Sequence, residues 1–195
     1  MRRKLSARLV IISALTVVSL AIAGQFFASL GSRATGNAEA DERDPLLLEI
    51  AKYRQWKLVN PIPVMMDPAA AAACAIAFPV NPHQTAFVSV YVNAKGASAM
   101  MTEAHPVFPE GSIIVKEKLS DKTSQKPTLL TVMIKREKGY NPESRDWDYL
   151  VLDGPASKIL DQGKLSSCNG CHQAYIDTDF VTRHYLPDSD RRTQR

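Results

Sequence analysis

The sequence contains few cysteines, only three among its 195 residues. Three cysteines cannot form the dense disulfide framework that stabilises many small exported domains, so the fold must depend on a hydrophobic core. The sequence also lacks internal repeats and any collagen-like or coiled-coil bias, which excludes solenoid and fibrous architectures. Because 45% of the residues are hydrophobic, we expect one compact domain, with or without a targeting segment.

Acidic residues are absent before Glu39, and this absence explains the formal net charge of +4. Four of the 24 basic residues lie within positions 1–23, so the rest of the chain has 20 basic residues against 20 acidic ones. The excess charge therefore does not belong to a folded domain, where it would indicate a nucleic acid partner. We expect no nucleic acid partner.

Residues 1–23 have the pattern of a secretory signal peptide. A basic head at Met1–Lys4 precedes the apolar run Leu9–Ala23, which ends in small residues. An uncleaved membrane anchor is the alternative, because the stretch up to Leu30 is long enough to span a bilayer, although Gly24 interrupts it. Both interpretations predict export, which in a bacterium means a periplasmic protein.

The rest of the chain divides into three parts by composition. Residues 24–44 are rich in small and charged residues and are predicted to be a flexible linker. Residues 45–187 are predicted to form a single domain, and the polar residues 188–195 a disordered tail.

Stretches rich in β-branched and aromatic residues predict four strands in this domain. They are Phe87–Asn93, Ser112–Lys118, Leu129–Lys135 and Trp147–Asp153. Short connections between them favour an antiparallel sheet. Short helices are predicted after Asp44, over Ala94–Glu103, around Ser157–Leu160 and after Cys171. Three prolines within residues 61–68 exclude regular structure there. The expected fold class is α+β, mainly an antiparallel β-sheet with a few short helices.

One sequence motif indicates a cofactor-binding site. It is Cys168-Asn-Gly-Cys171-His172. The pattern C-x-x-C-H is the attachment signature of a c-type haem. Its spacing lets two thiols reach the two vinyl groups of one porphyrin while the imidazole reaches the iron. We therefore expect a covalently attached haem c held by Cys168 and Cys171, with His172 as the metal ligand.

The same motif is compatible with three alternatives. Cys168 and Cys171 could form a redox disulfide, although such motifs sit near a parallel βαβ unit that the sequence does not predict. They could be half of a zinc site, although no second pair of ligands follows. The pattern could also arise by chance.

The position of the motif indicates the kind of haem protein. Small electron-transfer cytochromes place this motif early and use a methionine downstream as the second iron ligand. Here every methionine precedes His172. Four-helix cytochromes carry the motif near the C-terminus, but the preceding segments here are predicted to be strands. We expect a five-coordinate iron with one open side, on a β-rich scaffold.

Several short segments, taken in order, resemble the cytochrome P-460 family. They are Tyr53-Arg-Gln-Trp56, Val90-Tyr-Val-Asn93, Phe108-Pro-Glu-Gly111, Ile114-Val-Lys-Glu117, Asp146-Trp147, the C-x-x-C-H motif and Thr178-Asp-Phe-Val-Thr-Arg183. The resemblance extends from Tyr53 to Tyr185, which is nearly the whole predicted domain.

This resemblance implies a mainly antiparallel β domain, usually a homodimer, whose haem has histidine as its sole protein ligand. In the hydroxylamine-oxidising members a lysine is joined covalently to a porphyrin meso carbon, and that position falls on Lys116. Cytochrome c-prime-beta shares the fold, lacks the cross-link and binds nitric oxide. The implied function is redox chemistry on small nitrogen compounds, with hydroxylamine oxidation first and electrons passing to a redox partner cytochrome. A nitric oxide sensor or scavenger and a simple electron carrier are the alternatives.

Alternation along the predicted strand decides which side chains accompany Lys116. Ile114, Lys116 and Lys118 share one face, and Glu117 lies on the other. Without the resemblance, Lys116 is a solvated lysine on an edge strand. With it, Lys116 is expected to point at the haem as a catalytic and cofactor-binding residue.

The distal side departs from the hydroxylamine oxidisers, because they carry an arginine where this chain has Val88. An apolar wall suits neutral diatomic ligands, and Phe78, Phe87 and Phe108 are candidates to form it. Glu110 and Glu117 are the candidate general bases.

Arg183 is expected to pair with a haem propionate, with a surface role as the alternative. The remaining residues of interest are expected to have no role at the iron: Cys74 as a buried inert thiol, Trp56 and Trp147 as packing, and His83, His105 and His184 as isolated histidines.

Overall fold

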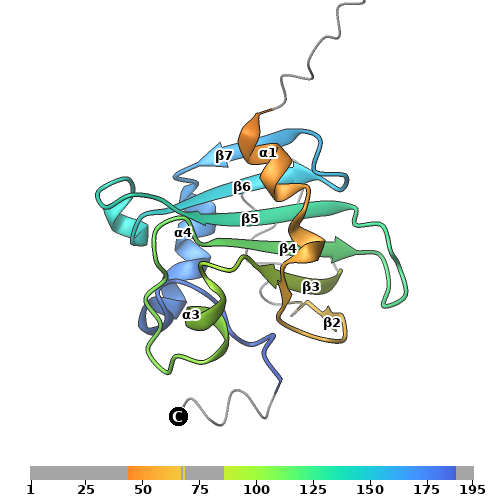
Figure 1. The fold of residues 1–195 in the computed structure, drawn as a ribbon, viewed down its shortest axis with the longest axis horizontal. Helices are drawn as coiled ribbons and strands as arrows, with labels where there is room; N and C mark the ends of the chain where they lie inside the picture. The colour runs from red at the N-terminus through yellow and green to blue at the C-terminus, as the bar shows by residue number, and fades with distance from the viewer. Residues whose placement is uncertain (1–43, 67, 69–85, 188–195) are drawn as a thin grey trace, which may run out of the picture. The chain divides into compact units, whose positions relative to one another are not determined.

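The computed structural model describes residues 44–66, 68 and 86–187 (Figure 1). All of them belong to one compact unit, Asp41–Arg195. The predicted signal peptide, nearly all of the predicted linker and the predicted tail lie outside the described residues, as do Cys74, Phe78 and His83. Within the described part, no helix is long and apolar enough to cross a membrane.

The described residues contain an antiparallel sheet, which confirms the predicted fold class. Its strands are β1 (Lys57–Leu58), β2 (Val64–Met65), β3 (Phe87–Val92), β4 (Ile113–Leu119), β5 (Leu129–Lys135), β6 (Trp147–Asp153) and β7 (Ile159–Gly163). The strand order is β1-β3-β4-β5-β6-β7, and β2 also pairs with β3. Every pairing is antiparallel. From β3 to β7, strands that are neighbours in the sequence are neighbours in the sheet.

Short helices connect and cover this sheet. They are the α-helices α1 (Pro45–Ile50), α3 (Ala97–Met101) and α4 (Ser166–His172), and the 3-10 helices η1 (Tyr53–Gln55), η2 (Pro142–Ser144) and η3 (Gln173–Thr178). The helix predicted after Asp44 is confirmed, because the Asp44 carboxylate accepts the Leu46 N–H at 2.9 Å and a proline follows the cap.

Two secondary-structure predictions were wrong. The segment predicted as a helix around Ser157–Leu160 forms a turn and the start of β7. The Asp153 carboxylate accepts the N–H groups of Ser157 and Lys158 at 2.7 and 2.9 Å, which folds the chain into a tight hairpin. The prolines within residues 61–68 do not exclude strand, because the two residues of β2 fit between them at the margin of the sheet.

Alternation along the strands gives the sheet two different apolar faces. The α1 face includes Val115, Val132 and Leu150, and Ile50 and Tyr53 from the N-terminal helices cover it. Figure 1 shows α1 lying across the strands on this side.

The opposite face, called the cleft face here, packs against the C-terminal segment. It includes Val90, Ile114 and Tyr149, with Phe180 and Val181 packed on them. Each face is buried, so β4 and β6 are buried almost along their full length.

Candidate functional site

An apolar cleft lies between the sheet and α4, on the cleft face. Its lining includes Ile114, Lys116, Met133 and Tyr149 from the strands and Cys168 and His172 from α4. The cleft has a volume of only about 40 Å³, and its lining is mainly apolar. The helix α4 has no side-chain cap, but Leu165 and Cys168 pack on the cleft-face cluster. Tertiary packing therefore holds this short helix in place.

The imidazole of His172 has a defined hydrogen-bonding state. Its Nδ1 lies 2.7 Å from the Phe180 carbonyl oxygen. A carbonyl oxygen only accepts, so Nδ1 carries the proton. Burial, reinforced by the positive charge of Lys116, lowers the pKa of His172 to about 4. The ring is therefore neutral at pH 7, and Nε2 keeps a lone pair for a metal ion.

The two cysteines of the motif form no disulfide, and both are partly buried. Burial raises the pKa of Cys168 to about 11, which makes it a poor thiolate donor at neutral pH. The antiparallel sheet contains no parallel βαβ unit in the described chain. These observations argue against a thioredoxin-type redox pair. Among the described residues, no group of three or more His, Cys, Asp or Glu side chains could hold a metal ion.

Lys116 lies on β4, in the middle of the sheet, opposite Val90 of β3 and Thr131 of β5. The alternative of an edge-strand lysine was therefore wrong. Its side chain is half-buried in the cleft lining, and Nζ lies 4.9 Å from the centre of the Tyr185 ring. Lys116 thus shares one cleft with Cys168 and His172. The structure brings Lys116, from the middle of the predicted domain, next to Cys168 and His172 near its C-terminal end.

Glu117 does not face this cleft. Its side chain lies on the α1 face, where it is 2% exposed. The Tyr53 hydroxyl donates a hydrogen bond to its carboxylate, and Arg54 Nε donates another at 2.6 Å. Glu110 is exposed. The prediction that one of them is a distal general base is not supported by this geometry, because Glu117 is on the wrong side of β4.

The candidates for an apolar wall are divided between the two faces. Val88 is fully buried and pairs with Lys118 across β3 and β4, so it shares the face of Lys116. Phe108 is buried in the cleft-face cluster, 5.4 Å from the Trp147 ring. The proposal for Phe87 was wrong, because strand alternation directs it to the α1 side.

Arg183 is 8% exposed, and its Nη1 donates to the Glu103 carbonyl at 2.5 Å. Its Nε and Nη2 are buried and make no hydrogen bond to the described residues. Buried guanidinium N–H groups need an acceptor, and a carboxylate fits their fork geometry. Arg183 is absent from the cleft lining itself.

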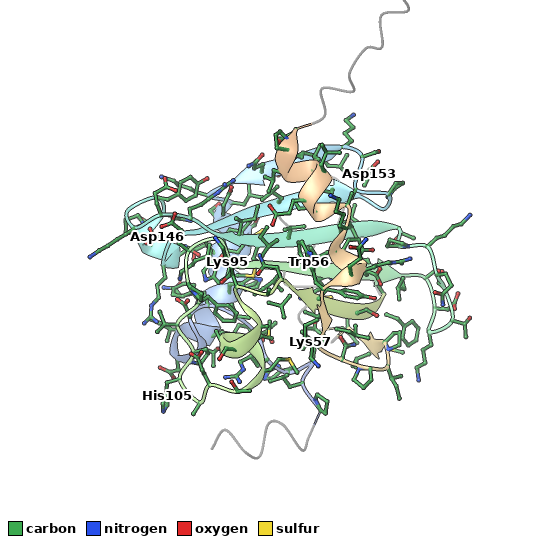
Figure 2. The ribbon with its side chains drawn as sticks, in the orientation of Figure 1. Trp56, Lys57, Lys95, His105, Asp146 and Asp153 are labelled. Atoms are coloured by element: carbon green, nitrogen blue, oxygen red, sulfur yellow. The ribbon has the colours of Figure 1, made fainter. Side chains whose placement is uncertain are left out.

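The two other histidines in the described chain lie outside the cleft lining. His105 is exposed on a loop (Figure 2). His184 is exposed, with its ring 5.5 Å from that of Tyr175. Trp147 is a fully buried member of the cleft-face cluster, and Trp56 packs partly buried against the α1 face, also labelled in Figure 2.

Sequence reasoning missed several residues around the site. Tyr149 lies with its ring 5.4 Å from that of His172, and its hydroxyl pairs with Ser144 at 2.5 Å. Asp179 directly precedes Phe180, whose carbonyl oxygen accepts the hydrogen bond from His172. No short sequence motif predicts these contacts, because the contacting residues come close only when segments distant in the sequence pack together.

The residues present fit a covalently attached haem. Two thiols and a neutral imidazole with a free Nε2 lie on one helix, and the buried N–H groups of Arg183 require an anion such as a propionate. The arrangement holds no competing carboxylate in the described cleft lining.

Comparison with known proteins agrees with this geometry. The family model described as Cytochrome P460 matches residues 50–183. No curated protein matches the chain significantly. The match covers most of the described unit and ends at Arg183, so the chain belongs to the cytochrome P-460 family, a family of haem-binding proteins.

Proposed function

We propose that this protein is an exported mono-haem c-type cytochrome with an open iron site, and that it oxidises hydroxylamine. The observation that carries the proposal is the hydrogen bond from His172 Nδ1 to the Phe180 carbonyl, in a cleft shared with Cys168 and Lys116. This bond fixes the tautomer of a ligand next to two available thiols.

Cys168 and Cys171 would hold the cofactor. Each thiol adds across one vinyl double bond, so the sulfur bonds to one carbon and the thiol hydrogen goes to the other. No oxidant is needed for this step. When bound, the haem supplies an iron that binds a small nitrogen compound and accepts its electrons.

Lys116 would be joined to a porphyrin meso carbon through Nζ. Forming this bond breaks one N–H and one C–H bond, and a peroxide takes up the two electrons and two protons and becomes water. The reaction requires the neutral amine as nucleophile. Support comes from the position of Lys116 in the cleft lining, in the same cleft as Cys168 and His172.

Arg183 would bind a haem propionate through its Nε and Nη2, the two donors that lack a partner among the described residues. Bidentate pairing would compensate for burying the guanidinium.

Oxidation of hydroxylamine to nitric oxide releases three electrons and three protons. The electrons would pass to a redox partner cytochrome. The protons would pass to water, because no carboxylate lies in the described cleft lining.

Binding of nitric oxide without turnover is the second candidate function. It is favoured by Val88, which is fully buried and apolar on the face of Lys116. The Val88 side chain offers no donor to orient a polar substrate, whereas a neutral diatomic molecule needs none.

Export would depend on residues 1–23, either as a cleaved signal or as an anchor, and would place the domain in the periplasm. We also propose that the protein is a homodimer, as the family resemblance implies.

The test is expression of the full chain in a host that matures c-type cytochromes. Denaturing mass spectrometry should find the haem on the peptide that contains Cys168 and Cys171, and the double variant with both replaced by alanine should lose it. Hydroxylamine turnover with an electron acceptor supports the enzyme, and tight nitric oxide binding alone supports the second candidate. A colourless, iron-free product contradicts the proposal, and a low-spin six-coordinate iron at rest indicates a simple electron carrier.

A further inference from the structure

The hydrogen-bond acceptor of His172 lies outside the helix that carries His172. We propose that Asp179 is a positioning residue, which fixes the Phe180 carbonyl to the end of the sheet and thereby orients the imidazole of His172. This inference rests on the proposed function, because it concerns the same iron ligand. Two observations support it. The Asp179 carboxylate accepts hydrogen bonds from Phe108 and Lys135. The next residue, Phe180, provides the carbonyl oxygen that accepts the hydrogen bond from His172 Nδ1.

The backbone at this point is unfavourable without outside support. Asp179 has φ 56° and ψ 40°, and Phe180 has φ 65°, so two consecutive non-glycine residues are left-handed. Such residues persist only where the surrounding structure holds them. This conformation turns the chain after η3 and aims the Phe180 carbonyl back at α4.

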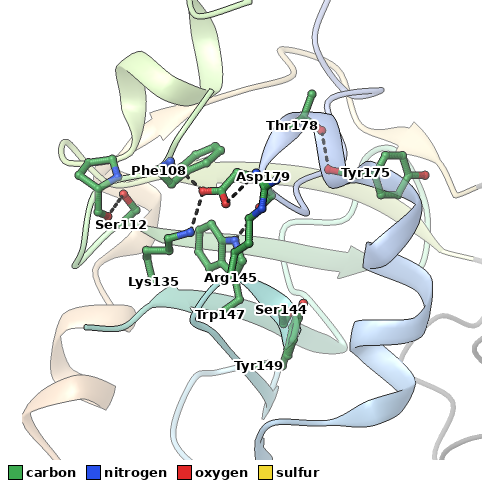
Figure 3. Close-up of polar contacts among 11 residues, drawn as sticks. Phe108, Ser112, Lys135, Ser144, Arg145, Trp147, Tyr149, Tyr175, Thr178 and Asp179 are labelled. Atoms are coloured by element: carbon green, nitrogen blue, oxygen red, sulfur yellow. Dashed lines mark hydrogen bonds and ion pairs between the residues drawn. The ribbon is translucent and has the colours of Figure 1, made fainter. Parts of the chain in front are cut away.

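Three groups, one from the loop before β4 and two from the ends of β5 and β6, hold Asp179 (Figure 3). The Phe108 N–H, in the segment before β4, donates to Oδ2 at 2.9 Å. Lys135 Nζ, at the end of β5, donates to the same oxygen at 2.7 Å. Trp147 Nε1, at the start of β6, donates to the Asp179 carbonyl at 2.7 Å. Arg145 Nη1 adds a longer contact, 3.9 Å from Oδ1.

These contacts are shielded from water. Asp179 is 1% exposed and Trp147 is fully buried. The sheet is the most extensively hydrogen-bonded part of the described chain, so it provides a rigid reference for the carbonyl. The orientation of the His172 ring is therefore set by the sheet, through Asp179 and Phe180, and not by α4 alone.

A purely architectural role for Asp179 makes a different prediction. If Asp179 only fastens the C-terminal segment, its loss lowers stability but leaves the bond between His172 and iron unchanged. If it positions the carbonyl, its loss also weakens the Nδ1–H hydrogen bond, and the imidazole donates less electron density to the iron.

The experiment compares Asp179→Asn with Asp148→Asn in the haem-loaded protein. Asp148 is the matched control, because it is also a fully buried carboxylate in an ion pair, with Arg136 at 2.6 Å. We expect Asp179→Asn to move the iron–histidine stretching band of the ferrous protein to lower wavenumber and to raise the midpoint potential. We expect Asp148→Asn to lower the melting temperature without moving either quantity.

Each outcome bears on the inference. An unchanged band and potential in Asp179→Asn overturns it, and so does an equal shift in both variants. If Asp179→Asn does not fold, Lys135→Met replaces it, because methionine has no donor, removes one anchor and keeps the carboxylate. A smaller shift in the same direction supports the inference and no shift overturns it. Absence of any iron–histidine band in the unmodified protein contradicts the proposed function instead.

Discussion

Replacing Glu117 with glutamine tests whether its carboxylate stabilises the fold or acts in catalysis. Glu117 is 2% exposed and accepts hydrogen bonds from Tyr53 and Arg54. A hydrogen bond to a buried charged group contributes about 1.5–3 kcal/mol. The Arg54 side chain is 44% exposed, so its ion pair adds at most about 1 kcal/mol. Because the glutamine oxygen still accepts a bond, we expect Glu117→Gln to lower the free energy of unfolding by about 1–3 kcal/mol.

The melting temperature should then fall by roughly 2–12 °C, since about 2–4 °C corresponds to 1 kcal/mol in a chain of this size. Thermal unfolding followed by circular dichroism measures this change. Steady-state hydroxylamine turnover should stay the same, because the carboxylate lies on the α1 face. Loss of a general base would reduce turnover by about 10²–10⁴-fold. A reduction of that size in Glu117→Gln, with Glu110→Gln unaffected, would refute the assignment of Glu117 to the structural face.

Three further changes test other parts of the structure. A bond from Lys116 Nζ to the porphyrin would alter the macrocycle, so Lys116→Ala should shift the ferrous absorption spectrum while Lys122→Ala leaves it unchanged; an identical spectrum in Lys116→Ala argues against the cross-link. Burial, together with its carboxylate partner, raises the pKa of Tyr53 above its ordinary value of 10, so Tyr53 contributes stability that is present below pH 10 and lost as the pH rises above it. Tyr53→Phe should flatten the fall in unfolding free energy at alkaline pH, measured by urea titration, and an unchanged slope contradicts this. Gly154→Ala should destabilise the fold by about 1–3 kcal/mol or more, because an added Cβ would lie 2.0 Å from the Pro127 carbonyl oxygen; a melting temperature equal to that of the parent protein would be inconsistent with this contact.

The central strands could be predicted from the sequence because their composition and alternation are strong. β3, β4, β5 and β6 begin and end within about a residue of the predicted bounds. β7 was missed because Ile159–Gly163 contains one β-branched residue and ends in glycine, so only its pairing with β6 makes it a strand.

The haem motif could be predicted because its residues are adjacent, whereas the surroundings of His172 could not. The acceptor of Nδ1 is a backbone carbonyl, which no side-chain pattern reveals. The anchors of Asp179 come from three distant segments, so tertiary structure alone assembles them. The position of Glu117 could be predicted from the sequence, because alternation along the strand already places its side chain on the other face of the sheet from Lys116.

The order of the strands has a consequence for how the protein folds. From β3 to β7 each strand pairs with the next one in the sequence, so these contacts close short loops. The residues after α4 also join the sheet through contacts of much longer sequence separation, such as Phe108 with Asp179, 71 residues apart. Hairpins can therefore assemble first, and the C-terminal segment docks on a scaffold already formed. Maturation of the C-x-x-C-H motif would then compete with the final docking step and not with formation of the sheet.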